Sequence, residues 1–263
     1  MGKAASQRVV MLGAGRVATH LAPALLHAGY ELLQVWSRTE ESAKSLSDSL
    51  GIPYTTNLDA VVADADIYIV CVSDSALSQV AERIVARVKT NSLFLHTAGS
   101  VGIELWQRCG ALRYGILYPL QTFSKERAVD FREVSLFVEA SDEETMTTIE
   151  RVAHGLSEKV YHADSKRRAQ LHIAAVFACN FANAMYGAAD RLLAEAGIPF
   201  EVLLPLIDET AAKVHALAPH SAQTGPAVRG DSAVLQNHMA ALAGDEDLHA
   251  MYALISNYIN KNR

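Results

Sequence analysis

Short apolar runs alternate with amphipathic segments from Arg8 to about Tyr161. Several of these runs are apolar on both faces, which is typical of parallel strands that helices cover on both sides. The segments between them have helical spacing, so the alternation predicts βαβ units and a mainly parallel sheet. A helix over Glu143–Leu156 and a strand over Lys159–Tyr161 close this half of the chain. The predicted strands before them are Arg8–Leu12, Leu32–Trp36, Ile67–Val72, Leu93–His96, Tyr114–Tyr118 and Ser135–Glu139.

After Asp164 the alternation stops and the pattern becomes that of long helices, broken at Gly197–Pro199, Pro219–Gly230 and Gly244. We therefore predict two domains, an α/β domain over residues 1–163 and an all-α domain over residues 164–263. The first helix of the second domain is predicted over roughly Lys166–Ala196. It has no charged residue from Leu171 through Ala189, which favours burial on all sides. Burial by a second subunit explains this pattern, so we expect a homodimer.

Composition narrows the class of partner. The chain has 263 residues, half of them hydrophobic, with 20% charged residues and a net charge of −6, which excludes a basic nucleic-acid surface and favours a small molecule. No apolar run is long enough to cross a membrane. The three cysteines are scattered, so a reducing cytoplasm is expected, and the histidines lack the spacing of a metal site.

A glycine-rich turn follows the first predicted strand, where Gly13-Ala14-Gly15-Arg16-Val17-Ala18 reads Gly-x-Gly-x-x-Ala. The first glycine permits a tight turn, and the second lets the backbone approach a pyrophosphate at the start of a helix. An ordinary βα turn is the alternative. The place of this glycine-rich segment in the first βαβ unit favours a Rossmann domain that binds a dinucleotide. The expected contacts are Gly13, Ala14, Gly15, Arg16 and Val17.

The end of the second strand bears on which nucleotide is bound. A site selective for NAD ends this strand in a carboxylate, whereas this chain has Ser37-Arg38-Thr39. The planar Arg38 guanidinium could pair with a 2′-phosphate, and Ser37 could add a hydrogen bond. Ser37 or Thr39 could also simply cap a helix. We predict NADP as the cofactor.

Two further strand ends should line the same crevice, because ligands of open α/β sheets lie at the carboxyl ends of the strands. Val72 and Ser73 follow one strand, and Thr97 follows another; all three are predicted cofactor contacts. Ser100 is a candidate for contact with substrate. Asp74 and Ser100 could instead cap the helices that follow them.

The sequence resembles a superfamily of two-domain reductases that includes pyrroline-5-carboxylate reductase, ketopantoate reductase and the 6-phosphogluconate and β-hydroxyacid dehydrogenases. It is most similar to NADP oxidoreductases in which a Rossmann-like domain precedes a helical domain of unknown function. The resemblance implies an all-α second domain of the 6-phosphogluconate dehydrogenase C-terminal-like type. The segments that carry it are Gly13–Ala18, His96–Ser100, Pro119–Phe123, His172–Phe177 with Asn180, and Thr224–Asp231.

One departure concerns the proton donor. Ketopantoate reductase and the β-hydroxyacid dehydrogenases place a lysine one helical turn before an asparagine, where this chain has Val176 before Asn180. The donor therefore cannot be carried over from that lysine, and the resemblance implies the fold more than a substrate.

Polar residues on the uncharged helix are the candidates for catalysis. On an unbroken α-helix, His172 and Asn183 lie about 20° apart and Asn180 about 80° from His172, so the three form a polar strip. His172 can donate a proton near neutral pH and is the first candidate for the acid, with Lys213 in reserve. The three could equally bond neighbouring helices.

The loop Pro219–Asp231 supplies candidate substrate contacts. Arg229 could bind a substrate carboxylate or only pair with Asp231, and Thr224 lies in the same segment. Gln121, from the Pro119–Phe123 segment, is a further candidate. The predicted function is reduction of a small carbonyl or imine compound by NADPH, or the reverse oxidation. A non-catalytic NADP sensor and a purely structural helical dimer are the alternatives.

Overall fold

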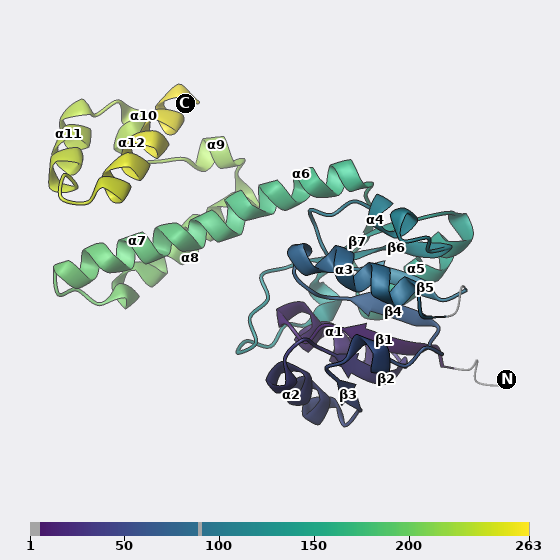
Figure 1. Ribbon diagram of the computed structural model, residues 1–263. Coiled ribbons are helices and arrows are strands. Elements are labelled where there is room, and N and C mark those ends of the chain that lie inside the picture. Colours follow the sequence, from purple (N-terminus) through teal and green to yellow (C-terminus); the bar gives the residue numbers. More distant parts are fainter. Residues whose placement is uncertain (1–5, 89–90, 263) are drawn as a thin grey trace. The chain divides into compact units, whose positions relative to one another are not determined.

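The computed structural model describes residues 6–88 and 91–262, and within these residues eight strands form one sheet in the order β3-β2-β1-β4-β5-β6-β7-β8 (Figure 1). All neighbouring strands are parallel except β6 and β7. The first six follow the Rossmann order. Their bounds are β1 Arg8–Leu12, β2 Glu31–Trp36, β3 Tyr54–Thr55, β4 Ile67–Val70, β5 Leu93–His96, β6 Arg113–Leu120, β7 Ser135–Ala140 and β8 Val160–His162.

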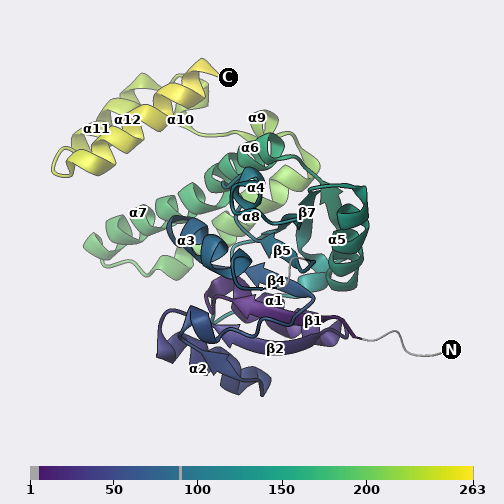
Figure 2. The ribbon, with the colours of Figure 1, turned by 45° about the vertical axis from the view of Figure 1, so that its right-hand side comes forward.

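Helices cover both faces of this sheet because successive residues of its buried strands point to opposite sides. Val9 and Met11 of β1 pack with helices α1 and α5, whereas Val10 and Leu12 pack with α3 and α4. Figure 2 shows α3 and α5 on opposite sides of the strands. The helices are α1 Arg16–His27, α2 Glu40–Leu50, α3 Asp74–Val85, α4 Glu104–Arg108 and α5 Glu143–Leu156.

The described chain divides into two compact units, Met1–Cys179 and Asn180–Arg263. The sequence predicts domains 1–163 and 164–263, whose outermost residues 1–5 and 263 lie outside the described residues. The sheet ends at β8, and α6 (Ser165–Ala175) follows with Asp164 as its N-cap, but α6 belongs to the first compact unit.

A buried ion pair holds α6 to the sheet. The Arg168 side chain is 1% exposed, pairs with Glu139 of β7 and donates to the carbonyl of Val101 at 2.6 Å. Ser165 donates to the same carboxylate at 2.8 Å. A buried guanidinium needs such partners, since leaving it unpaired would cost several kcal/mol, on the order of 3–5. The start of α6 is therefore part of the α/β unit.

A π-helix, Val176–Phe181, follows α6 and interrupts the single helix that the sequence predicts over Lys166–Ala196. The remaining unit is helical, as expected (Figure 1). The Pro219–Asp231 segment, predicted as a loop, contains two short helices, since Pro219 and Pro226 each suit a first helical turn. The helices are α7 Ala182–Glu195, α8 Leu204–Ala216, α9 Pro219–Ala222, α10 Pro226–Arg229, α11 Ser232–Ala241 and α12 Glu246–Lys261.

Across residues 6–88 and 91–262, every helix is too short or too polar to cross a membrane.

Candidate active site

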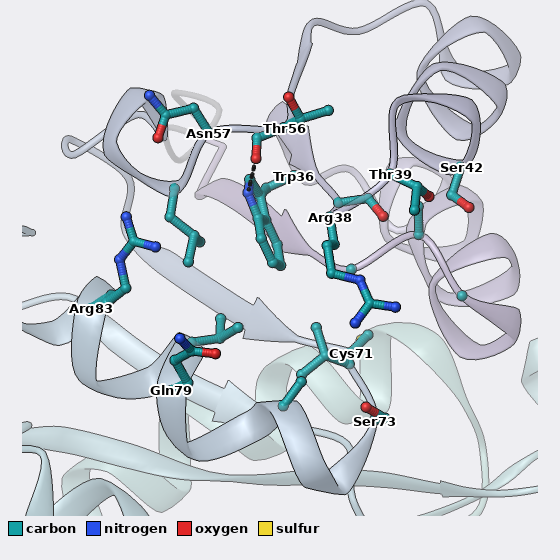
Figure 3. Close-up of a pocket in the computed structure, with 18 of the residues that line it drawn as sticks. Trp36, Arg38, Thr39, Ser42, Thr56, Asn57, Cys71, Ser73, Gln79 and Arg83 are labelled. Carbon is teal, nitrogen blue, oxygen red and sulfur yellow. Dashed lines mark hydrogen bonds between the residues drawn. The ribbon is translucent and has the colours of Figure 1, made fainter.

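A pocket of about 530 Å³ opens at the carboxyl ends of β1, β2 and β4 (Figure 3). Three segments that the sequence assigns to the cofactor meet in it: the turn Gly13–Gly15, the end of the second strand at Ser37–Thr39, and Val72–Ser73 after β4. The parallel sheet brings these segments together, because each follows a strand that ends at the same edge.

Gly13 makes the turn that this pocket requires. Its φ is +125°, and a Cβ on it would lie 2.3 Å from the carbonyl oxygen of Cys71. Its amide donates to the carbonyl of Trp36 at 2.7 Å. The turn thereby joins the ends of β1, β2 and the segment after β4, and only glycine can occupy the position.

Gly15 has a different role, because the space beside it is open. A Cβ there would meet only the Cys71 carbonyl oxygen, at 4.0 Å, and the residue has φ −84° and ψ −170°, which any residue can adopt. It is the N-cap of α1, and no side chain caps this helix. The first-turn amides of α1 and the helix dipole therefore favour an anion at this end of the pocket.

The side chains around the pocket carry positive charge. Arg38, Arg83 and Lys125 line it, and the described lining residues include no Asp or Glu. Arg83 pairs with Asp59 at 3.0 Å, whereas Figure 3 shows the Arg38 guanidinium pointing across the pocket toward Ser73. Three cations and a helix N-terminus suit a ligand with several phosphate charges.

Some predicted cofactor contacts lie outside this lining. Arg16 and Val17 are the first residues of α1, where Arg16 is exposed and Val17 packs against the core. Thr97 is buried and forms a hydrogen bond with the Cys71 thiol. Burial raises the pKa of this thiol to about 12, and the bond to Thr97 acts in the opposite direction. Thr39, by contrast, does line the pocket; it is also the N-cap of α2, where its side chain makes no capping bond.

A second group of polar side chains lies within the first unit, beyond the end of β5. The Tyr118 hydroxyl of β6 is 3.1 Å from Nδ1 of His172 on α6. Gly99 packs against both rings, since a Cβ on it would lie 2.8 Å from His172 Nδ1 and 2.8 Å from Tyr118 Cζ. Burial raises the pKa of Tyr118 above its ordinary value, so the hydroxyl keeps its proton at neutral pH.

Ser100 lies next to this group and donates a hydrogen bond to Asp74. The sequence suggested that Asp74 caps the following helix, but Ser73 occupies the N-cap position of α3 and Asp74 is the first residue of that helix. The interpretation of Asp74 as a cap is therefore wrong, because Asp74 lies within the helix and its carboxylate accepts from Ser100.

The predicted substrate residues are divided between the two units. Gln121 is exposed, and its Oε1 accepts from the Thr122 amide at 2.8 Å. Asn180, Asn183, Lys213, Thr224 and Arg229 lie in the second unit. Thr224 borders an apolar pocket of that unit, and the exposed Arg229 ends α10. Their roles in substrate binding stay predictions.

The π-helix changes the basis for the predicted polar strip. A π turn holds one more residue than an α turn, and one extra residue rotates everything after it by about 100° relative to an unbroken α-helix. The π-helix Val176–Phe181 lies between His172 and Asn183. The 20° alignment expected from regular spacing is therefore wrong, although a role for either residue in catalysis is untested.

Tyr118 and the pocket cations Arg83 and Lys125 were not among the site residues predicted from the sequence. Tyr118 is the last residue of the predicted strand Tyr114–Tyr118. Its place at the carboxyl end of a strand could have identified it as a candidate site residue. Lys125 lies in the long connection between β6 and β7, for which no periodic pattern predicts a position.

Comparisons with known proteins agree with this geometry. Residues 8–98 match the family described as "NADP oxidoreductase coenzyme F420-dependent", and residues 134–259 match a domain of unknown function, DUF2520. A crystal structure described as "putative NADP oxidoreductase" from Bacteroides fragilis is 46% identical, covers 97% of this chain and 98% of its own, and has a TM-score of 0.93. The chain belongs to the same family of NADP oxidoreductases as this Bacteroides fragilis protein. The expected family, fold class and NADP cofactor are thus confirmed at the level of the family.

More distant structures share the fold. An imine reductase from Myxococcus stipitatus in complex with NADP+ is 19% identical, with a TM-score of 0.69 over 97% of this chain and 93% of its own. A reductive aminase from Aspergillus terreus in complex with NADPH has 19% identity and a TM-score of 0.70 over 98% of this chain and 100% of its own. The curated human protein "Glucose-fructose oxidoreductase domain-containing protein 2" is 35% identical over 66 residues, which are 25% of this chain and 17% of that protein.

Proposed function

We propose that the pocket beside Gly13–Gly15 binds NADPH and that this oxidoreductase reduces a small carbonyl or imine compound. The observation that carries the proposal is the lining of the pocket, in which an open glycine, an uncapped helix N-terminus and three cationic side chains converge without a carboxylate among the described lining residues. When bound, the nicotinamide supplies a hydride to the acceptor carbon. The same lining supports the reverse oxidation by NADP+.

The residues around the pocket fit the parts of this cofactor. The α1 amides and the open side of Gly15 would hold the pyrophosphate. Arg38, with Ser37 beside it, would hold the 2′-phosphate, and Lys125 would add positive charge. A carboxylate at the end of β2 would repel that phosphate, and Ser37-Arg38-Thr39 has none.

Carbonyl and imine compounds are chosen because of the shared fold. The imine reductase and the reductive aminase bind NADP(H) on the same architecture, and reduction of a C=O or C=N bond needs the same two additions, a hydride to carbon and a proton to the heteroatom. The substrate residues proposed from sequence, Ser100, Gln121, Thr224 and Arg229, belong to this proposal, as do Asn180 and Asn183.

The test has two stages. Calorimetry first measures the dissociation constants of NADPH and NADH, and tighter binding of NADPH is expected. A panel of keto acids, aldehydes and cyclic imines is then incubated with NADPH, and its oxidation is followed by absorbance. Binding of NADPH without turnover of any compound would favour the alternative of a non-catalytic NADP sensor. That alternative is suggested by Val176, which occupies the position of the superfamily lysine.

A homodimer formed by the helical unit is part of the proposal. Helices α7 and α8 have no buried side chain in the described chain, although the stretch Leu171–Ala189 carries no charge. Leu206 of α8 and Leu254 of α12 are 62% and 72% exposed. Large apolar side chains exposed along several helices favour cover by a second copy. A cytoplasmic location stays a prediction from the scattered cysteines.

A further inference from the structure

Tyr118 and His172 form a hydrogen-bonded pair that the sequence did not anticipate, because 54 residues separate them. Their rings meet edge to face, with centroids 6.1 Å apart and an angle of 71°. The Gly99 backbone lies directly against both rings. This contact fixes the pair beside the β5 loop, since any side chain at position 99 would have to displace the phenol and the imidazole.

The pair lies at the edge of the sheet where Rossmann domains carry out their chemistry. His96, the last residue of β5, pairs with Ile116 of β6, so Tyr118 lies two residues beyond the end of β5. Ser100 and Asp74 occupy the same edge, and Asp74 is close enough to raise the pKa of Tyr118. Ligands of open α/β sheets bind beyond these carboxyl ends.

We propose that the Tyr118 hydroxyl donates the proton to the substrate oxygen or nitrogen and that His172 returns a proton to Tyr118 through Nδ1. This inference rests on the proposed reduction by NADPH. As the acceptor carbon takes the hydride, the tyrosine O–H bond breaks toward the substrate heteroatom. The Nδ1–H bond of the imidazolium breaks toward the phenol oxygen at the same time. Tyr118 ends neutral, and His172 takes a new proton from water.

The surroundings explain why a tyrosine here needs a histidine. Burial raises the pKa of Tyr118, and Asp74 adds to the rise, so a tyrosinate left behind after proton donation would be unfavourable. Arg168 acts in the opposite direction, but Glu139 neutralises it. Transfer from His172 avoids the tyrosinate altogether. His172 is half-buried and can therefore exchange its proton with solvent.

The other ionisable neighbours do not supply that proton. His96 is fully buried, and burial together with the Arg168 charge lowers its pKa to about 3, so it is neutral at physiological pH. An arginine guanidinium does not release its proton in proteins, so Arg168 is not the source. Asp74 accepts from Ser100 and carries negative charge. Among these groups, His172 is the one that contacts the phenol, and an imidazole can both take up and release a proton.

The first test compares Tyr118→Phe with Tyr161→Phe, a matched control that removes a hydroxyl from a 48% exposed ring of β8. With a substrate found in the panel, Tyr118→Phe should lower kcat by roughly 10²–10⁴-fold, the usual loss of a general acid. Its affinity for NADPH should be unchanged, because Tyr118 does not line the cofactor pocket. Tyr161→Phe should leave both quantities unchanged.

The second test separates proton supply from packing. His172→Gln can still bond the phenol but cannot give it a proton. If an imidazolium supplies the proton, kcat of the native protein should fall as the pH rises, and kcat of His172→Gln should be low and lack this dependence. In the protein without NADPH, ¹⁵N NMR of His172 should show a changed Nδ1 signal in Tyr118→Phe but not in Tyr161→Phe.

The outcomes are distinguishable. If the native protein reduces a compound and Tyr118→Phe reduces it equally well, the role of the pair is overturned and the proposed reduction stands. An Nδ1 signal insensitive to Tyr118→Phe would overturn the hydrogen bond itself. Failure of the native protein to reduce any compound of the panel, although NADPH binds, would overturn the proposed function and the pair together.

Discussion

Gly15→Ala is expected to weaken NADPH binding while the fold stays intact. The position is not strained, because φ −84° and ψ −170° suit alanine and the new methyl group would be 4.0 Å from its nearest neighbour, the Cys71 carbonyl oxygen. An alanine N-cap costs about 0.5–1 kcal/mol relative to glycine. The smaller entropy of the unfolded chain returns about 0.4–1 kcal/mol. The free energy of unfolding should therefore change little.

The methyl group would instead occupy the space where the pyrophosphate approaches the α1 amides. Losing one charge-assisted hydrogen bond costs about 1.5–3 kcal/mol, which raises the dissociation constant roughly 10- to 150-fold. Calorimetry with NADPH measures this loss, and urea unfolding measures stability. Gly13→Ala is the contrasting variant: its Cβ would lie 2.3 Å from the Cys71 oxygen at φ +125°, so it should lose roughly 2–6 kcal/mol of stability.

A Gly15→Ala protein that is folded and binds NADPH as tightly as the native protein would refute the reasoning, because the cofactor would then lie away from this turn. A large loss of stability in Gly15→Ala would also contradict it, since the space beside Gly15 would have to be filled by protein.

Three further predictions follow from charge, exposure and burial. Arg38→Ala should raise the dissociation constant of NADPH by roughly 10- to 150-fold but leave that of NADH unchanged, and equal losses for both would contradict a 2′-phosphate contact. Light scattering at micromolar concentration should give twice the chain mass of 28.4 kDa, and a monomer would contradict the dimer. The buried His96 has a pKa of about 3 in the fold and near 6.5 in the unfolded chain, so the unfolded state binds more protons between these values. Urea unfolding should show stability falling by at most about 1.4 kcal/mol per pH unit from pH 6.5 toward 3, less steeply in His96→Phe.

The sheet was predictable from the sequence because its central strands are apolar on both faces. The predicted β1 and β5 have the observed bounds, and the other predicted strands differ by one or two residues at one or both ends. The strand β3 was missed because it has only two residues, Tyr54 and Thr55, both half-buried. A pair of half-buried residues has no periodicity to detect.

The two halves of the candidate site differ in what the sequence could reveal. The cofactor half consists of local signals, a glycine turn and a strand end, whose places the parallel topology fixes. The Tyr118–His172 pair depends on how α6 packs on the sheet, which in turn depends on the Arg168–Glu139 ion pair. The π-helix had no signal at all, because the uncharged stretch from Leu171 to Ala189 offers no alternation of polar and apolar residues.

The position of Val176 gains a physical explanation from this arrangement. Superfamily members with a lysine at this place have a cation on the helix that can donate the proton. In this chain His172, four residues earlier on α6, bonds a phenol at the end of β6. If Tyr118 supplies the proton, a second donor one turn away is unnecessary, and an apolar Val176 would help to exclude water from the reacting atoms. Val176→Lys then provides a direct comparison. It should not restore turnover to Tyr118→Phe if the donor belongs to the sheet, and recovery of turnover in that double variant would show that the helix position can still deliver the proton.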